Sequence, residues 1–172
     1  MAVIEAIATQ YLEADAATVT FSGIPSTYEH LQVRMSVRDG AATSRTYLFL
    51  RFNSDTTEAN YSRHWMSGIA TAVAGAAGTS QTRIGGIIAS AGTPAGSYST
   101  VIVDVLDYAN ANKNTTASYL SAVADSHPAL FFGSVLWDNT AAVTSISLSD
   151  ASGLGANLVR GSEFTLYGLN SA

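Results

Sequence analysis

Hydrophobic and polar residues alternate along much of this chain, and the alternation is clearest between His30 and Arg38. One set of alternate positions there is apolar, namely Leu31, Val33, Met35 and Val37. The intervening positions hold the polar residues Gln32, Arg34, Ser36 and Arg38. Side chains of a β-strand point alternately to its two faces, whereas a helix would spread these four apolar residues around its circumference. The segment is therefore predicted to be a strand with one buried face, and Arg38 is expected on the polar face.

Similar segments recur at close spacing and are separated by turn-forming residues. We expect further strands at residues 18–21, 47–52, 61–66, 82–89, 99–108, 117–123, 130–137, 143–148 and 163–169. Gly85 and Gly86 interrupt one of them and indicate either a bulge or a close backbone approach. The side chains expected in the core of the later strands are Val101, Val103, Val105, Val143, Ile146, Leu148, Phe164, Leu166 and Leu169. About ten short strands with turns between them predict an all-β fold, a single antiparallel β-sandwich of jelly-roll-like form.

The length of 172 residues fits one domain, and we expect residues 1–172 to form a single β-sandwich. Two segments fit the strand pattern poorly. Residues 2–12 carry Ile4, Ile7 and Tyr11, which also suit one side of a helix, so residues 1–14 are expected to be an N-terminal arm or an edge strand. Residues 69–79 are small, apolar and glycine-rich, and they are expected to be a flexible loop or a close-packed contact.

Charge is sparse, because only 12% of the residues are charged while 47% are hydrophobic. A soluble domain usually has about 25% charged residues. So few charges protect a lone monomer poorly against association, but they suit a protein that covers part of its surface with neighbours. The alternative is an exposed surface rich in Ser, Thr and Asn. The chain has no cysteine, which excludes disulfides and thiolate metal sites.

The charge balance and the apolar segments also argue against two classes of partner. The net charge is −5 and no run of Lys or Arg occurs, so we expect no binding to nucleic acid. No apolar stretch reaches the roughly 20 residues that a membrane helix needs, so we expect no membrane partner. No basic residue precedes Arg34, which argues against a secretory signal.

Residue types that carry catalysis or bind metals are present, but their spacing is not typical of a site. His30, His64 and His127 stand far apart and form no zinc-binding pair. Ser97 and Ser134 lack the flanking glycines of a nucleophile elbow. We expect no catalytic, metal-binding or cofactor-binding residue and no cofactor, although the three histidines could still converge in space.

Carboxylates and asparagines offer two weaker alternatives. Asp104 and Asp107 are candidates for paired acid chemistry, but Asp104 alternates with valines and is expected to point out of its sheet. A cluster of oxygen-bearing side chains could hold calcium and comprises Asp107, Asn110, Asn112 and Asn114. It lacks the glycine and closing glutamate of a calcium-binding loop, so an asparagine-rich turn is the favoured interpretation. The pair Gly153 and Gly155 matches no complete nucleotide-binding motif.

Three aromatic residues are candidates for stacking on sugars, namely Tyr61, Trp65 and Trp137. Aromatic rings at exposed positions are common in carbohydrate sites, but in a sandwich they more often fill the core. Trp137 follows Val135 and Leu136, which favours a place in the core.

Five stretches of the chain resemble a family of small tailed-phage structural proteins. They are TVTFSGIPSTYEHLQVRMSVR (18–38), LRFNSDTTEANYS (50–62), VDVLDYANANKNTTA (103–117), LWDNTAAVTSISL (136–148) and GSEFTLYGL (161–169). Members of this family occur as separate virion proteins and as terminal modules of fibre or tail proteins. The resemblance implies a β-sandwich or jelly-roll module on a virion, commonly a homotrimer, and it brings no catalytic residues.

The first functional hypothesis is a capsid decoration, or cement, protein of a bacteriophage that docks on the shell and stabilises it. Its partners would be the major capsid protein or other virion proteins, and its location the virion, assembled in the host cytoplasm. The alternative is a fibre or tail receptor-binding module that recognises a host glycan, which would need an exposed aromatic shelf or a polar cleft. An enzyme such as a glycan depolymerase ranks last, because it would need paired carboxylates in a pocket.

Overall fold

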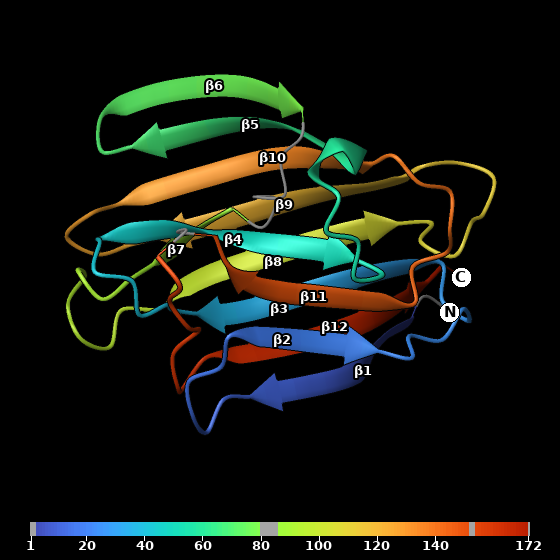
Figure 1. Cartoon of the computed structure of the whole chain (residues 1–172), viewed down its shortest axis with the longest axis horizontal. Coiled ribbons are helices and arrows are strands. Elements are labelled where there is room, and N and C mark those ends of the chain that lie inside the picture. The colour runs from blue at the N-terminus through green and yellow to red at the C-terminus, as the bar shows by residue number, and fades with distance from the viewer. Residues whose placement is uncertain (1–2, 80–85, 152–153, 172) are drawn as a thin grey trace.

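The computed structural model describes residues 3–79, 86–151 and 154–171, and within these ranges the chain forms twelve strands and one short 3₁₀ helix, η1 (Glu58–Asn60) (Figure 1). The larger sheet has eight strands, in the spatial order β1 (Val3–Tyr11), β12 (Glu163–Asn170), β3 (His30–Val37), β8 (Ser99–Leu106), β9 (Thr115–Val123), β10 (Ala129–Trp137), β5 (Tyr61–Ile69) and β6 (Ala72–Thr79). The smaller sheet has the order β2 (Thr18–Ser22), β11 (Ser145–Asp150), β4 (Arg45–Phe52) and β7 (Ile87–Ala89). All paired strands in both sheets are antiparallel.

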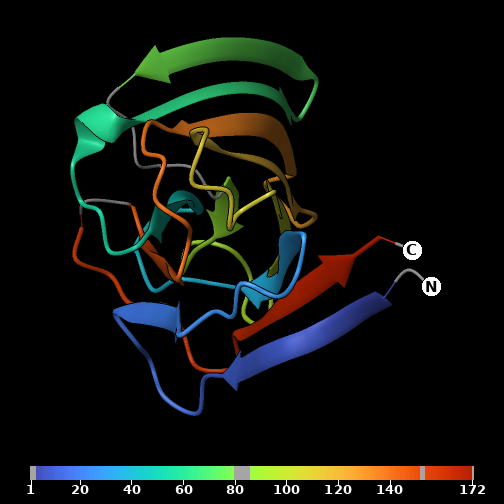
Figure 2. The ribbon, with the colours of Figure 1, turned by 90° about the vertical axis from the view of Figure 1, so that its right-hand side faces the viewer.

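The order of the strands is that of a jelly roll. Strands from opposite ends of the chain pair in a nested series: β1 with β12, β2 with β11, β3 with β8, and β4 with β7. The chain crosses between the two sheets along this series, which wraps the first four strands against later ones. The predicted all-β sandwich of jelly-roll form is thus confirmed. Strands β9, β10, β5 and β6 extend the larger sheet beyond this framework, and Figure 2 shows it curling toward β6.

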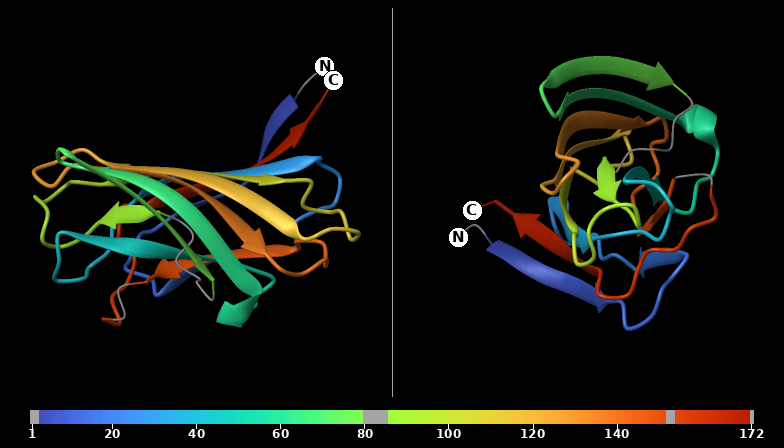
Figure 3. Two further views of the ribbon diagram at one scale, coloured as in Figure 1. Left: turned by 90° about the horizontal axis from the view of Figure 1, so that it is seen from above. Right: turned by 90° about the vertical axis from the view of Figure 1, so that its left-hand side faces the viewer.

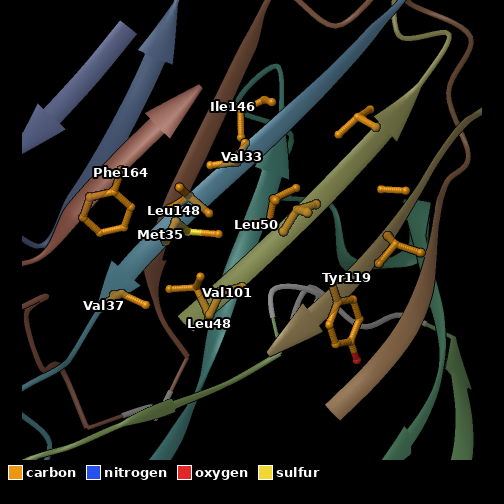
Figure 4. Packing of buried hydrophobic residues seen from close by; sticks show 14 of the residues in the cluster. Val33, Met35, Val37, Leu48, Leu50, Val101, Tyr119, Ile146, Leu148 and Phe164 are labelled. Atoms are coloured by element: carbon orange, nitrogen blue, oxygen red, sulfur yellow. The ribbon is translucent and has the colours of Figure 1, made fainter. Parts of the chain in front are cut away.

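The core lies between the two sheets and is built from the alternate apolar residues of facing strands. Figure 4 shows Val33, Met35 and Val37 of β3 against Leu48 and Leu50 of β4. All five side chains are buried, as are the expected core residues of β8, β11 and β12, apart from Leu169. Strict alternation along these strands therefore positions the core, as the sequence predicts.

Leu169 was expected in the core and is only half-buried. It lies directly opposite His30, on the outer face of the larger sheet. Phe164 and Leu166 are an even number of positions apart and share the inner face, whereas Leu169 is three positions beyond Leu166 and must point outward.

The expectation that Arg38 lies on the polar outer face is wrong. Strand β3 ends at Val37, and the chain then forms an isolated parallel bridge between Arg38 and Ala89. Arg38 is buried at this point, and its side chain reaches the loop at residues 93–97. The alternation that holds within a strand does not extend past its end.

The structure also shows the conformations of the two segments that fit the strand pattern poorly. Residues 3–11 form the edge strand β1, which pairs with β12, so the start of β1 lies beside the end of β12 (Figure 3). The expected flexible loop at residues 69–79 is instead mostly strand, because 72–79 form the edge strand β6, and most of its side chains are exposed. Backbone hydrogen bonds hold β6 to β5, so the strand needs no bulky side chains to form.

Gly86 has the close backbone approach that was one of its two predicted roles. Its φ is +82°, and a Cβ at this position would overlap Ser121 and Tyr119. The amide of Ile87 donates to Ser121 Oγ at 2.9 Å, which places the start of β7 tightly against β9. Gly85 and the rest of residues 80–85 lie outside the described residues.

Candidate docking surface

The three histidines lie in different parts of the fold. His30 starts β3 and its Nδ1 accepts a hydrogen bond from the Asp107 amide at 3.0 Å. His64 is exposed in the middle of β5, and His127 is exposed in the turn between β9 and β10. In the part of the chain that the structure describes, no group of three His, Cys, Asp or Glu side chains is arranged to hold a metal ion.

In the asparagine-rich turn, protein groups contact Asp107 Oδ2 and Asn110 Oδ1. Lys113 Nζ lies 2.7 Å from Asp107 Oδ2, and Asn110 Nδ2 donates to the same oxygen at 2.9 Å. The hydrogen bond from Lys113 lowers the pKa of Asp107. Asp104 points out of the sheet, as expected, and accepts a hydrogen bond from Gln32 Nε2 at 2.6 Å. The two carboxylates thus serve separate surface contacts.

Two of the three aromatic candidates for sugar binding are part of the core. Trp137 and Tyr61 are each only 1% exposed, so neither ring can stack on a ligand. The ring of Trp137 lies 5.6 Å from that of Phe52, centroid to centroid. Trp65 is half-buried, and its ring lies 5.3 Å from that of Phe131.

A buried polar cluster at the end of β3 contains charged residues of the kind found in active sites, but its hydrogen bonds connect parts of the fold. Arg38 Nη1 donates to Thr93 Oγ1 at 2.9 Å and to the carbonyl oxygens of Pro94 and Ser97 at 3.0 and 2.8 Å. These acceptors replace the water that a buried guanidinium loses, and they tie the loop to the sandwich. The neighbouring Asp39 is fully buried, accepts hydrogen bonds from Thr46 and the Ala41 amide, and has its pKa raised by burial to about 6.

A contiguous set of large apolar side chains lies on the outer face of the larger sheet. We call it the outer patch, and it comprises Met66, Val73, Leu120, Leu130 and Phe132. Their exposed fractions range from 43% for Leu120 to 80% for Val73. They come from the four strands β9, β10, β5 and β6, which Figure 1 shows together at one margin of the molecule.

Strand register makes the outer patch continuous. Phe132 lies directly opposite Leu120 on one side and Met66 on the other. Leu130 lies opposite Gly68, which in turn lies opposite Val73. Directly opposed residues of antiparallel strands point to the same face, with Cβ atoms about 5 Å apart.

Gly68 leaves a hollow in the outer patch. The hollow has a volume of about 220 Å³ and is bordered by Met66, Val73, Leu130 and Phe132. A Cβ built on Gly68 would have no atom within 4 Å, so the space above the backbone is open. An apolar side chain from another molecule would fit such a hollow.

The four strands that carry the outer patch are free of charge on their outer face. The outward positions are Thr116, Ser118, Leu120 and Ala122 of β9; Leu130, Phe132, Ser134 and Leu136 of β10; Ser62, His64, Met66 and Gly68 of β5; and Val73, Gly75, Ala77 and Thr79 of β6. None is Asp, Glu, Lys or Arg. A shallow groove of about 620 Å³ adjoins the outer patch, and its polar lining includes Ser62, His64, Thr79, Thr116 and Ser134.

Sequence reasoning did not identify the outer patch. The run Leu130–Phe131–Phe132 is apolar at consecutive positions, which is a signal for apolar groups on both faces of a strand. Such a run is read by default as a strand buried on both sides. Which of its two faces packs against the second sheet depends on the pairing of distant strands, and that is a tertiary property.

Comparison with known proteins adds little to the fold. No protein-family model matches the chain, and no curated protein sequence matches it. Among solved structures, galectin LEC-6 of Caenorhabditis elegans aligns with 95% of this chain and 96% of its own, at 11% identity and a TM-score of 0.35. A likeness of this degree carries no argument about function. The described part of the chain contains no helix long and apolar enough to cross a membrane.

Proposed function

We propose that this chain is a non-catalytic structural protein of a phage virion, a capsid decoration protein that docks on the shell through the outer patch. The observation that carries the proposal is the uncharged outer face of β9, β10, β5 and β6, with five large apolar side chains exposed on it. Contiguous exposed apolar patches on soluble proteins usually mark interaction sites. The resemblance to phage structural proteins supplies the class of partner, the major capsid protein or another virion protein.

The composition of this face suits a protein–protein interface. Interface cores are depleted in charged residues, and apolar contacts do not weaken when salt screens charges. Hydroxyl groups such as those of Ser118 and Ser134 lie beside the apolar side chains and can form hydrogen bonds across an interface with another protein. The hollow above Gly68 offers a place for one side chain of the shell protein.

The alternative, a receptor-binding module for a host glycan, would use the polar groove beside the outer patch. The groove offers hydroxyl groups and the imidazole of His64. Against it stands the burial of Trp137 and Tyr61, which removes two of the three rings proposed to stack on sugars. We therefore rank docking on a protein shell first.

Two measurements test the proposed function. The first is a reconstruction of intact particles produced from the genome that encodes this chain. We expect density for the chain on the capsid lattice, with the outer patch facing the shell. Density only at a tail tip, or absence of the chain from the particles, would overturn the proposal.

The second measurement is rebinding of purified chain to particles that lack it, followed by sedimentation. Replacing Met66 and Phe132 by Ser removes two patch side chains, and we expect affinity to fall at least about tenfold, because each loses about 1.5 kcal/mol or more of apolar burial. The control is Leu106→Ser, which removes a side chain of similar exposure, 50% against 58% for Met66 and Phe132, outside the outer patch. Equal binding by the double variant and the control would contradict the assignment. Loss of binding by His64→Ala alone, with glycan binding by the wild type, would favour the alternative.

A further inference from the structure

Strand β6 forms one end of the larger sheet and leaves one of its edges unpaired among the described strands. It pairs with β5 from Ile69↔Ala72 to Ser62↔Thr79 without a shift in register. Its eight residues are Ala72, Val73, Ala74, Gly75, Ala76, Ala77, Gly78 and Thr79, and all but Gly78 are exposed. The backbone N–H and C=O groups on the unpaired side therefore form a template for another strand.

Strand β6 lacks four of the features that commonly protect an edge strand. It has no charged residue, no proline and no bulge, and it is eight residues long. The opposite end of the same sheet is protected, because β1 carries Glu5 and a register shift between Ala6 and Ala8. In the smaller sheet the end strands are short, with five residues in β2 and three in β7. Of the edges described, β6 is the one that is both long and unprotected.

We propose that β6 pairs antiparallel with β6 of a second copy of this chain, so that two larger sheets join across a two-fold axis. The same unprotected edge is present on both copies, and a two-fold contact covers both at once, leaving only the protected β1 edges outside. Each copy carries a net charge of −5, yet no charged residue lies on β6 to repel its partner. The small side chains let the two backbones approach closely, and the outer patches of the two copies become neighbours through Val73.

The size of the contact predicts a weak dimer. Eight strand residues span about 26 Å, at about 3.3 Å per residue. The smallest specific interfaces bury roughly 600 Å² on each partner, which would require a strip about 23 Å wide along this edge. A contact made by the edge of one strand is narrower than such a strip, so we expect a weak dimer that dissociates in the micromolar range or above.

Single cysteines test the pairing, since the chain has no cysteine of its own. In a two-fold antiparallel pair one residue lies opposite itself, with Cα atoms about 4.5 to 5.5 Å apart, which suits a disulfide. In the series Val73→Cys, Ala74→Cys, Gly75→Cys, Ala76→Cys and Ala77→Cys, we expect oxidation to give a disulfide dimer at one position far faster than at the others. Thr18→Cys, on the exposed edge strand β2, is the matched control and should stay monomeric. Equal cross-linking at all five positions, or at Thr18→Cys, would overturn the proposal.

Sedimentation of the unmodified chain and of a charge variant gives a second test. We expect a monomer–dimer equilibrium for the wild type and at least tenfold weaker association for Ala76→Lys, because each copy would then carry a like charge near the middle of the contact edge. Thr18→Lys adds the same charge on another edge strand and should associate like the wild type. A wild-type chain that is monomeric at 100 μM, or trimeric as the family resemblance implies, would refute the two-fold contact. These tests use purified chain alone, so their outcome is separate from that of the virion proposal.

Discussion

The indole Nε1 of Trp137 donates a hydrogen bond to Asp55 Oδ2 at 2.8 Å, which joins the end of β10 to the loop after β4 across 82 residues. Asp55 also accepts from Asn60 Nδ2 at 2.8 Å and from the Thr57 amide at 2.9 Å. Burial alone would raise the pKa of Asp55, but these hydrogen bonds outweigh it and lower the pKa to about 2. The Asp55 carboxylate thus holds the loop after β4 in place and accepts the hydrogen bond of the buried Trp137 indole N–H.

We expect Asp55→Ala to destabilise the fold by about 2 kcal/mol, because it removes three charge-assisted hydrogen bonds and leaves the buried indole N–H without its acceptor. Asp55→Asn retains one acceptor oxygen and should lose less. Urea unfolding followed by tryptophan fluorescence measures both. The matched control is Asp138→Ala, which removes an exposed aspartate next to Trp137 and should change the free energy of unfolding by about 0.5 kcal/mol or less. Equal losses of unfolding free energy for Asp55→Ala and the control would show that the hydrogen bond from Trp137 to Asp55 does not stabilise the fold.

The buried carboxyl of Asp39 should make stability depend on pH in the opposite sense from Asp55. Burial raises the pKa of Asp39 to about 6 in the fold, against about 3.9 in the unfolded chain. The unfolded state therefore ionises first, and stability is full below about pH 4 and falls as the pH rises through about 6, by up to about 3 kcal/mol. The contribution of Asp55 is present above pH 4 and is lost as the pH falls toward 2.

The variant Asp39→Asn isolates the contribution of Asp39. It keeps a similar shape and an acceptor for the Ala41 amide, but it does not ionise. We expect the decline in the free energy of unfolding between pH 4 and pH 6 to become clearly shallower than in the wild type. Urea titrations at half-unit pH intervals measure both slopes, and identical slopes would show that Asp39 does not titrate as described.

Two glycines on neighbouring strands should respond to alanine with opposite signs. A Cβ at Gly133 in β10 would lie 2.6 Å from ring atoms of Tyr119, whose side chain is 2% exposed and cannot move away freely. We expect Gly133→Ala to cost about 1 to 3 kcal/mol. A Cβ at Gly68 in β5 meets no atom within 4 Å, so Gly68→Ala should stabilise the strand by about 0.5 kcal/mol.

Thermal unfolding of the two glycine variants, compared with the wild type, gives both signs in one experiment. A lower melting temperature for Gly133→Ala together with an unchanged or higher one for Gly68→Ala is the expected result. Because Gly68 forms the hollow of the outer patch, the same Gly68→Ala variant can enter the particle-rebinding assay as a folded protein with a partly filled hollow. A loss of stability on Gly68→Ala would mean that the space above Gly68 is smaller than described.

The local sequence pattern was sufficient to predict the strands of the jelly-roll framework. It failed where long-range packing decides whether a segment forms a strand or a side chain is buried. The alternation from Leu31 to Val37 predicts the inner face of β3 because side-chain direction follows backbone geometry alone. Arg38 was misplaced by the same rule, since the strand ends before it. Strand β6 was missed because Ala and Gly give no hydrophobic alternation, while its hydrogen bonds to β5 are made by the backbone.

The sequence by itself determined the all-β class, the positions of most strands and the identity of most core residues, because these depend on the period-two alternation of apolar side chains. Only the tertiary structure decided the nested strand pairing, the burial of Arg38 and Asp39, and the exposure of Phe132, Met66 and Val73. These depend on long-range packing: the smaller sheet packs against the inner face of the larger one, and these three side chains lie on the opposite face. The outer patch lies on the face of the larger sheet that points away from the smaller one, and the proposed contacts with other molecules use this face and the edge of β6.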